Sequence, residues 1–120
     1  MKILIIDDDP AITAVFEETL KKEGYEVISA LDGQTGIDKV KAEKPDLILL
    51  DQILPDTKGN EVLKKLKADP ETQNVKIAIL TNFGQNELVQ DAINSGAADY
   101  ILKYQIEPVD LLNKVKGILI

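Results

Sequence analysis

The sequence has 120 residues, of which 44% are hydrophobic and none is cysteine, and its formal net charge at pH 7 is −7. This length suits one domain with a buried core, and the lack of cysteine excludes disulfides and thiolate metal sites. All fourteen basic residues are lysines, which excludes histidine-dependent catalysis and disfavours nucleic-acid binding. The apolar runs are too short to span a membrane, and no signal peptide is recognisable. We therefore expect one cytoplasmic domain over residues 1–120, with no nucleic-acid or membrane contact.

Strand and helix patterns alternate along the whole chain. Five short apolar runs are typical of strands, and each is followed by apolar residues at helical spacing. The expected strands are Lys2–Ile6, Tyr25–Ala30, Asp46–Leu50, Lys76–Leu80 and Ala98–Leu102, each followed by a helix, the fourth of them over Gln85–Ser95. The run at Asp46–Leu50 is continuously apolar after its first residue, which indicates a central strand buried on both faces.

Local signals mark where several helices begin and end. Asp9 followed by Pro10 is a typical helix start, with the acid as N-cap and proline in the first turn. Gly24 and Gly96 are typical C-terminal stops. A strand–helix unit repeated five times predicts an α/β fold with right-handed parallel crossovers and helices on both faces of the sheet. We expect a doubly wound, flavodoxin-like (βα)5 sheet in the order 2-1-3-4-5.

Polar residues follow four of the five expected strands. They are Asp7 and Asp8 after the first, Asp51 after the third, Thr81 after the fourth and Lys103 after the fifth. The carboxyl ends of parallel strands lie at one edge of the sheet, so we expect one shared crevice. Three carboxylates about 4 Å apart would repel by roughly 4 kcal/mol per pair, which calls for a cation. Oxygen ligands favour Mg²⁺, while a lysine and a hydroxyl suit a phosphoryl group carried on a carboxylate.

These motifs resemble the receiver domain of two-component response regulators over essentially the whole chain. The matching pieces are Ile5–Pro10, Asp46–Asp51 with Leu54, Pro55 and Gly59, Ile79–Thr81, and Gly96–Lys103. The resemblance implies a stand-alone signalling switch that accepts a phosphoryl group on Asp51. A sensor histidine kinase or a phosphotransfer protein would supply this group, and a changed contact face would signal to a downstream protein target. Such a protein catalyses only its own phosphorylation and dephosphorylation.

The resemblance also implies a Mg²⁺ site beside the phosphoacceptor. Asp8 and Asp51 would be direct ligands, Asp7 a ligand through water, and the backbone carbonyl of Ile53 a further ligand. Asp9, by contrast, is expected only to cap the first helix.

Further roles concern the phosphoryl group and the switch. Thr81 would hydrogen-bond the phosphoryl group, Lys103 would pair with it, and Tyr100 would be the aromatic side chain whose rotamer follows Thr81. Ile53 and Phe83 lie at the two positions that influence the hydrolytic water in this family, and Asn82 adds bulk beside them. Because neither apolar side chain can hydrogen-bond a water, we expect slow self-dephosphorylation.

Three departures from the family pattern are visible, and three other interpretations stay open. Tyr104 stands where the family has a proline after its lysine, Lys58 where an acid is common, and Asn82 where a small residue is common.

The missing proline keeps open the interpretation that the chain is a degenerate receiver, which binds partners without phosphorylation. A haloacid-dehalogenase-like phosphatase would need a second acid at Ile53. A Rossmann domain would need a glycine-rich turn after the first strand.

Overall fold

Five strands and five helices alternate in the computed structural model, which describes residues 1–82, 86–103 and 105–120. The elements are β1 Lys2–Ile6, α1 Pro10–Lys22, β2 Glu26–Ala30, α2 Gly33–Glu43, β3 Leu47–Asp51, α3 Gly59–Ala68, β4 Lys76–Thr81, α4 Asn86–Asn94, β5 Asp99–Leu102 and α5 Pro108–Leu119. The predicted strand–helix alternation is therefore confirmed.

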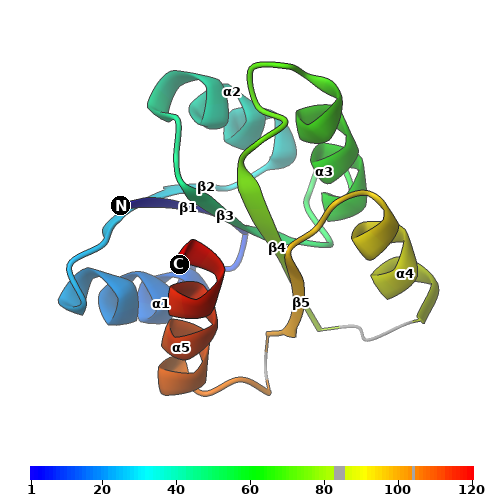
Figure 1. Ribbon diagram of the computed structural model, residues 1–120. Helices are drawn as coiled ribbons and strands as arrows, with labels where there is room; N and C mark the ends of the chain where they lie inside the picture. Colours follow the sequence, from blue (N-terminus) through cyan, green and yellow to red (C-terminus); the bar gives the residue numbers. More distant parts are fainter. Residues whose placement is uncertain (83–85, 104) are drawn as a thin grey trace.

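The strands form one parallel sheet in the order β2-β1-β3-β4-β5. Helices α1 and α5 cover one face of this sheet, and α2, α3 and α4 cover the other (Figure 1). The predicted order 2-1-3-4-5 is confirmed, and β1 and β3 are neighbours where the order reverses, as expected for a doubly wound sheet. No helix within the described ranges is long and apolar enough to cross a membrane.

The strand side chains alternate between two hydrophobic cores, one on each face of the sheet. In β3, whose five residues are all buried, Ile48 and Leu50 belong to the core under α2, α3 and α4, whereas Leu47 and Leu49 belong to the core under α1 and α5. Because successive strand residues point to opposite faces, Asp51 continues toward α1 and α5. The residue after it, Gln52, continues toward α3 and α4.

Several strand boundaries differ by one residue from the sequence prediction. β3 includes Asp51, which pairs with Leu80, but not Asp46, whose exposed carboxylate accepts a hydrogen bond from the Lys2 backbone N–H at 2.8 Å. β2 begins after Tyr25, because the Tyr25 backbone N–H donates to the Leu20 carbonyl at 3.3 Å and so belongs to the end of α1. These shifts reflect hydrogen bonds between elements, which a local pattern does not specify.

The remaining boundary differences also amount to one residue. β4 extends to Thr81 and β5 begins at Asp99 rather than Ala98, whose backbone N–H donates to the Ile77 carbonyl at 2.7 Å. Within the described residues, α4 runs over Asn86–Asn94, and the predicted first residue of that helix, Gln85, lies outside them.

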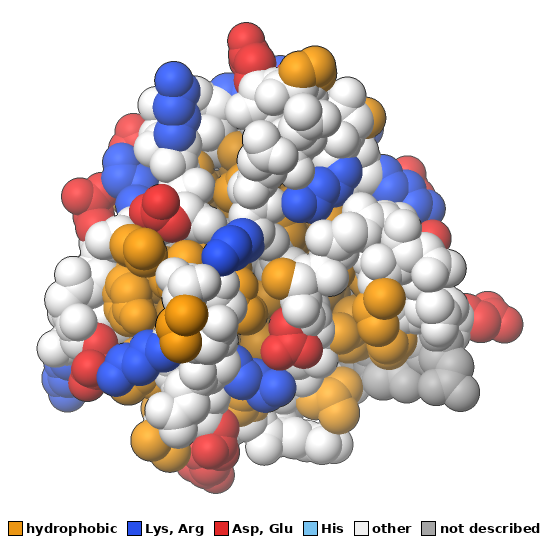
Figure 2. Space-filling view, viewed as in Figure 1, with side chains coloured by type: hydrophobic (Ala, Val, Ile, Leu, Met, Phe, Trp, Pro, Cys, Tyr) orange, Lys and Arg blue, Asp and Glu red, His pale blue; other side chains and the backbone are white. Residues whose placement is uncertain are grey.

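Charged side chains of both signs are interspersed over the face seen in Figure 1. Figure 2 shows basic, acidic and apolar side chains next to one another across the helices that border this view. A nucleic-acid-binding surface instead gathers its basic residues into a patch or stripe. The charged side chains visible on this face are thus of both signs.

Candidate functional site

Three aspartates meet at the carboxyl ends of β1 and β3. Asp7, Asp8 and Asp51 each offer a carboxylate oxygen, and these oxygens all lie within 4.8 Å of one another. Asp7 and Asp51 are 1% and 6% exposed, whereas Asp8 is exposed to solvent. The strands bring the acids together because Ile6 of β1 pairs with Leu50 of β3, one residue before each buried aspartate. The predicted acidic crevice is therefore present.

Lys103 places its ammonium group among the buried acids. Its Nζ lies 2.7 Å from Asp7 Oδ2 and 3.4 Å from Asp51 Oδ2, and its side chain is only 4% exposed. The Lys103 backbone N–H donates to the carbonyl of Thr81 at 2.7 Å, which ties the lysine to the end of β4. Three carboxylates and one ammonium leave two negative charges uncompensated when all four groups are ionised.

Burial raises the pKa of Asp51 to about 6. This value includes a second upward contribution from the negative charge of Asp7, an opposing contribution from the charge and hydrogen bond of the Lys103 ammonium, and a smaller upward contribution from Asp8. Loss of hydration destabilises the ionised carboxylate, and a nearby like charge acts in the same direction. The Asp51 carboxylate is therefore held in a site that favours binding of a cation or a proton.

The donor set fits a divalent metal ion with a preference for oxygen ligands. Its members are carboxylates from two adjacent strand ends, two of them buried, and they carry more negative charge than Lys103 neutralises. Mg²⁺ and Mn²⁺ both suit such ligands, and Mg²⁺ typically takes one or two carboxylates and keeps several waters. The exposed position of Asp8 leaves the cluster open to an entering ion.

Three consecutive acids after β1 have three different environments. Asp7 is buried, and its Oδ1 accepts a hydrogen bond from the Asp9 backbone N–H at 2.9 Å. Asp9 Oδ1 accepts from the backbone N–H groups of Ala11 at 3.1 Å and Ile12 at 3.4 Å. The predicted role of Asp9 as the N-cap of α1 is confirmed, which distinguishes it from Asp8 in the cluster.

The turn after Asp51 is held against the strand by a glycine. The Gly59 backbone N–H donates to the Gln52 carbonyl at 2.7 Å, and a Cβ at Gly59 would lie 2.5 Å from the Asp51 carbonyl oxygen. A side chain at this position would therefore displace the end of β3. Ile53, in the same turn, forms an isolated bridge with Lys58, and its side chain is 48% exposed.

Asp56 anchors the same turn to a second element. Its carboxylate accepts hydrogen bonds from the backbone N–H groups of Gly33 at 2.8 Å and Gln34 at 3.0 Å, at the start of α2. These two bonds hold the pKa of Asp56 below its usual value. No role was predicted for Asp56 from the sequence, since an acid beside a proline in a loop has many roles and nothing local indicates a contact with α2.

Thr81 and Tyr100 lie on β4 and β5, the two strands that follow β3 across the sheet. Thr81 is fully buried at the end of β4, one residue after Leu80, which pairs with Asp51. Tyr100 is partly buried against the core under α2, α3 and α4. Both residues therefore lie where a change at the acidic edge can reach α4 and β5.

Three residues singled out in the sequence follow β4 or β5 along the chain. Asn82 is exposed directly after β4. Phe83 and Tyr104 lie outside the described residues, so the predictions made for them rest on the sequence.

Gln52 and Asn60 had no predicted role, yet both are polar and buried, with exposed fractions of 0% and 3%. A polar residue directly after a buried strand is the one local signal that pointed to Gln52.

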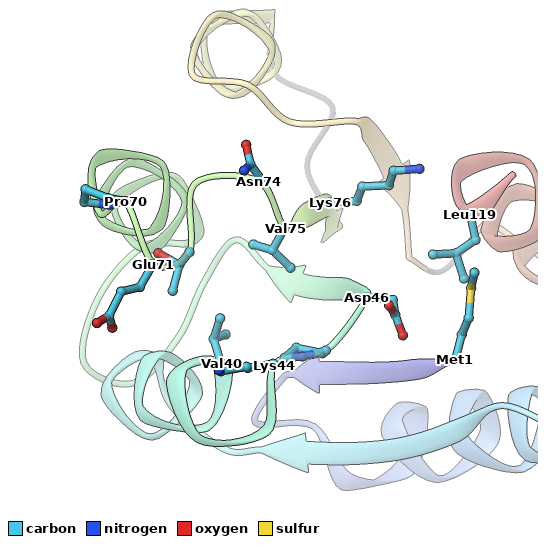
Figure 3. Close-up of a pocket in the computed structure, with 12 residues that line it drawn as sticks. Met1, Val40, Lys44, Asp46, Pro70, Glu71, Asn74, Val75, Lys76 and Leu119 are labelled. Atoms are coloured by element: carbon cyan, nitrogen blue, oxygen red, sulfur yellow. The ribbon is translucent and has the colours of Figure 1, made fainter.

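A pocket of about 390 Å³ opens at the other end of the sheet. Figure 3 shows its lining, with Met1, Asp46 and Lys76 contributed by the amino ends of the strands and Leu119 by α5. In this pocket the Asp46 carboxylate accepts a hydrogen bond from the backbone N–H of Lys2. The buried acids of the candidate site thus lie at the opposite edge of the sheet from this pocket.

Comparison with known proteins yields one family. A family described as the response regulator receiver domain matches residues 3–116. Sporulation initiation phosphotransferase F of Bacillus subtilis is 37% identical over 102 residues, which cover 85% of this chain and 81% of that protein. Several other relatives are longer, and this chain spans between 26% and 52% of their length.

Solved structures share the fold across the whole sheet. The CheY-like receiver domain protein of Methanospirillum hungatei has a TM-score of 0.92 and 37% identity, over 98% of this chain and 92% of that chain. The Mn²⁺-bound form of the response regulator Rcp1 has a TM-score of 0.82 and 28% identity, over 98% of this chain and 90% of that chain. Both likenesses extend over the strand ends that carry the acids.

Proposed function

Because this chain belongs to the response regulator receiver domain family, whose members are phosphorylation-dependent signalling switches, we propose that Asp51 is its phosphoacceptor. The observation that carries this proposal is the position of Asp51, which is buried, within 4.8 Å of the carboxylate oxygens of Asp7 and Asp8, and 3.4 Å from Lys103 Nζ. In this proposal residues 1–120 form one receiver domain whose chemistry acts on itself alone.

The proposed reaction moves a phosphoryl group from a phosphohistidine of a donor protein to Asp51. A carboxylate oxygen of Asp51 attacks the phosphorus, the P–N bond of the donor breaks, and the imidazole leaves as it takes up a proton. The carboxylate must be ionised to attack, and with a pKa of about 6 it is ionised in most molecules above pH 7. Lys103, whose Nζ lies 3.4 Å from Asp51 Oδ2, would pair with the added negative charge.

The proposal includes Mg²⁺ as the divalent metal that the family binds. Asp8 and Asp51 would hold it directly, Asp7 through water, and the carbonyl of Ile53 would complete the protein ligands. Support comes from the two uncompensated negative charges of the cluster and from the Mn²⁺ bound in Rcp1. The bound ion would neutralise charge on the transferred phosphoryl oxygens.

The signal is proposed to leave through the face formed by α4, β5 and α5. Thr81 would hydrogen-bond the phosphoryl group, and Tyr100 would change rotamer as Thr81 moves. A surface pocket lined by Tyr100, Gln105, Ile106 and Lys114 lies on this face and suits a downstream protein target. The phosphorylation state would shift an equilibrium between two existing conformations, because these contacts differ between them.

The proposed donor is a sensor histidine kinase or a phosphotransfer protein. The name of the Bacillus subtilis relative records a phosphotransferase, which supports a partner of this class. The cytoplasm is the proposed location, since donors that obtain their phosphoryl group from ATP are present there.

The test is the mass of the protein after incubation with acetyl phosphate and Mg²⁺. We expect a gain of about 80 Da, the mass of one added phosphoryl group, in the parent protein. Asp51→Asn should abolish the gain, and the matched control Asp46→Asn, at the other end of β3, should retain it. A gain that persists in Asp51→Asn would assign the modification to another residue, and no gain in the parent would favour a receiver that works without phosphorylation.

A further inference from the structure

The side chains of Gln52, the residue after the proposed phosphoacceptor Asp51, and of Asn60 form a buried hydrogen-bonded pair of amides. The side chain of Gln52 donates from Nε2 to Asn60 Oδ1 at 2.8 Å, and Gln52 Oε1 accepts from the Asn60 backbone N–H at 2.9 Å. Gln52 is 0% exposed and Asn60 is 3% exposed. Breaking such bonds would leave buried polar groups without partners, which is unfavourable. The two residues are therefore expected to move together.

Gln52 also supplies the cap of α3. The residue at the N-cap position, Lys58, makes no side-chain cap hydrogen bond. Instead the backbone oxygen of Gln52 accepts from the first N–H of the helix, at Gly59, and its side-chain oxygen accepts from the second, at Asn60. The first N–H groups of a helix have no partner within it, so the start of α3 depends on the residue that follows Asp51.

Asn60 extends the connection to α4. Its Nδ2 donates to the Leu88 carbonyl at 3.2 Å and to Asp91 Oδ2 at 2.9 Å, and both acceptors belong to α4. The Oδ1 atom and the backbone N–H of Asn60 are thus hydrogen-bonded to Gln52, and its Nδ2 atom is hydrogen-bonded to α4. Asp91 Oδ2 also lies 3.1 Å from Lys64 Nζ, on the solvent side.

The route is separate from the one through Thr81 and Tyr100. Adjacent residues of one strand end point to opposite faces, so Asp51 lies in the acidic crevice while Gln52 reaches toward α3 and α4. Any displacement of the peptide between Asp51 and Gln52 acts on the amide pair directly. By contrast, Thr81 and Tyr100 lie on β4 and β5.

We propose that Gln52 and Asn60 are positioning residues that couple the state of Asp51 to the position of α4. The inference rests on the proposed function, since it needs a phosphoryl group at Asp51 as the event that is transmitted. When the turn after Asp51 rearranges around that group, Gln52 and the start of α3 move with it. The two hydrogen bonds from Asn60 to α4 then either displace this helix or break. An element with two discrete hydrogen-bonded arrangements can carry such coupling.

The experiment compares amide chemical shifts of the full chain with and without beryllofluoride and Mg²⁺. In Asn60→Asp, the carboxylate still accepts from Gln52, but the donor to Leu88 and Asp91 is gone. We expect this variant to lose most of the shift change over residues 87–94, while the changes around Asp8 and at Tyr100 persist. The double variant Asn60→Asp with Asp91→Asn reverses donor and acceptor, and it should regain the α4 response.

Two further variants keep the test decisive. Gln52→Met removes both amide bonds with little change in volume and should lose the α4 response in the same way. Lys64→Met removes the exposed ion pairs of Lys64 with Asp91 and Glu61, leaves the bonds of Asn60 in place, and should respond like the parent. An undiminished α4 response in both Asn60→Asp and Gln52→Met, or no recovery in the double variant, overturns the coupling alone. A parent protein without any response at Asp8 and Tyr100 overturns the proposed function together with it.

Discussion

The central strand β3 is bordered by an aspartate on each side, and the two have opposite environments. Asp46, before the strand, is exposed and accepts a hydrogen bond from the Lys2 backbone N–H. Asp51, at the end of the strand, is 6% exposed, lies beside Asp7 and Lys103, and has a pKa raised to about 6. Two aspartates five residues apart, one just before β3 and one at its last residue, thus differ in exposure and in their hydrogen-bonding and charged neighbours.

The difference arises from what the neighbouring strands deliver to each edge. At the carboxyl ends, β1 adds Asp7 and the segment after β5 adds Lys103, so charges gather in a buried place. At the amino ends, Lys76 donates to the Ile118 carbonyl at 2.7 Å and stays exposed, as Asp46 does. Burial and like charges coincide at the carboxyl edge, and together they raise the pKa of Asp51.

The largest expected effect is a difference in stability between variants of two lysines, Lys103 at the carboxyl ends of the strands and Lys76 at their amino ends. Lys103→Met should lower the free energy of unfolding of the metal-free protein by about 3 kcal/mol at pH 7, because Asp7 and Asp51 would stay buried without a counter-charge. Lys76→Met should change it by less than about 0.5 kcal/mol. Urea unfolding in the presence of a chelator measures both, and equal effects of the two substitutions would contradict the comparison.

The next effect is the pH dependence of stability. The folded-state pKa of Asp51 is raised above its ordinary value of 3.8 to about 6, so folding favours its protonated form. Stability should therefore fall as the pH rises from about 4 through 6, by on the order of 2 kcal/mol in the metal-free protein. Asp56 and Asp69, whose pKa values are lowered, act in the opposite direction at lower pH.

Asp51→Asn should remove this pH dependence, and Asp46→Asn should leave it intact. The measurement is thermal unfolding of each variant between pH 4 and pH 8 with a chelator present. A parent protein that becomes more stable over this interval, with no difference from Asp51→Asn, would show that Asp51 does not titrate as its environment indicates.

A smaller effect distinguishes two adjacent acids at the carboxyl edge. Asp9→Ala should lower stability by about 1 kcal/mol through loss of the α1 cap and leave Mg²⁺ affinity nearly unchanged. Asp8→Ala should instead weaken Mg²⁺ binding and raise the stability of the metal-free protein, because like charges are relieved. Calorimetric titration with Mg²⁺ measures the affinities, and equal losses in both variants would refute this division.

The smallest expected effect concerns the lifetime of the phosphorylated form. Ile53 presents an exposed apolar side chain in the turn after Asp51 and offers no hydrogen bond to an attacking water. Ile53→Asn should therefore accelerate self-dephosphorylation a few-fold, which corresponds to less than about 1 kcal/mol in the barrier. The control Ile93→Asn changes a similarly exposed isoleucine on α4. Decay in Mg²⁺ followed by mass would show both rates, and unchanged decay in Ile53→Asn would defeat the account.

Local patterns in the sequence determined the elements and their order. The apolar run of β3, the Asp9–Pro10 start of α1 and the repeated strand–helix unit each depend on neighbouring residues alone. The rule that parallel strand ends share one edge then placed Asp7, Asp8 and Asp51 together. These features followed from periodicity and topology, which a single sequence contains.

Only the tertiary structure decided which groups touch across elements. It pairs Lys103 with Asp7 more closely than with Asp51, holds the turn through Asp56 at the start of α2, and connects Gln52 through Asn60 to α4. Each of these contacts depends on distances and directions between packed helices and strands. Such geometry is set by how whole elements pack, and polar side chains in loops carry no periodic signal that would reveal it.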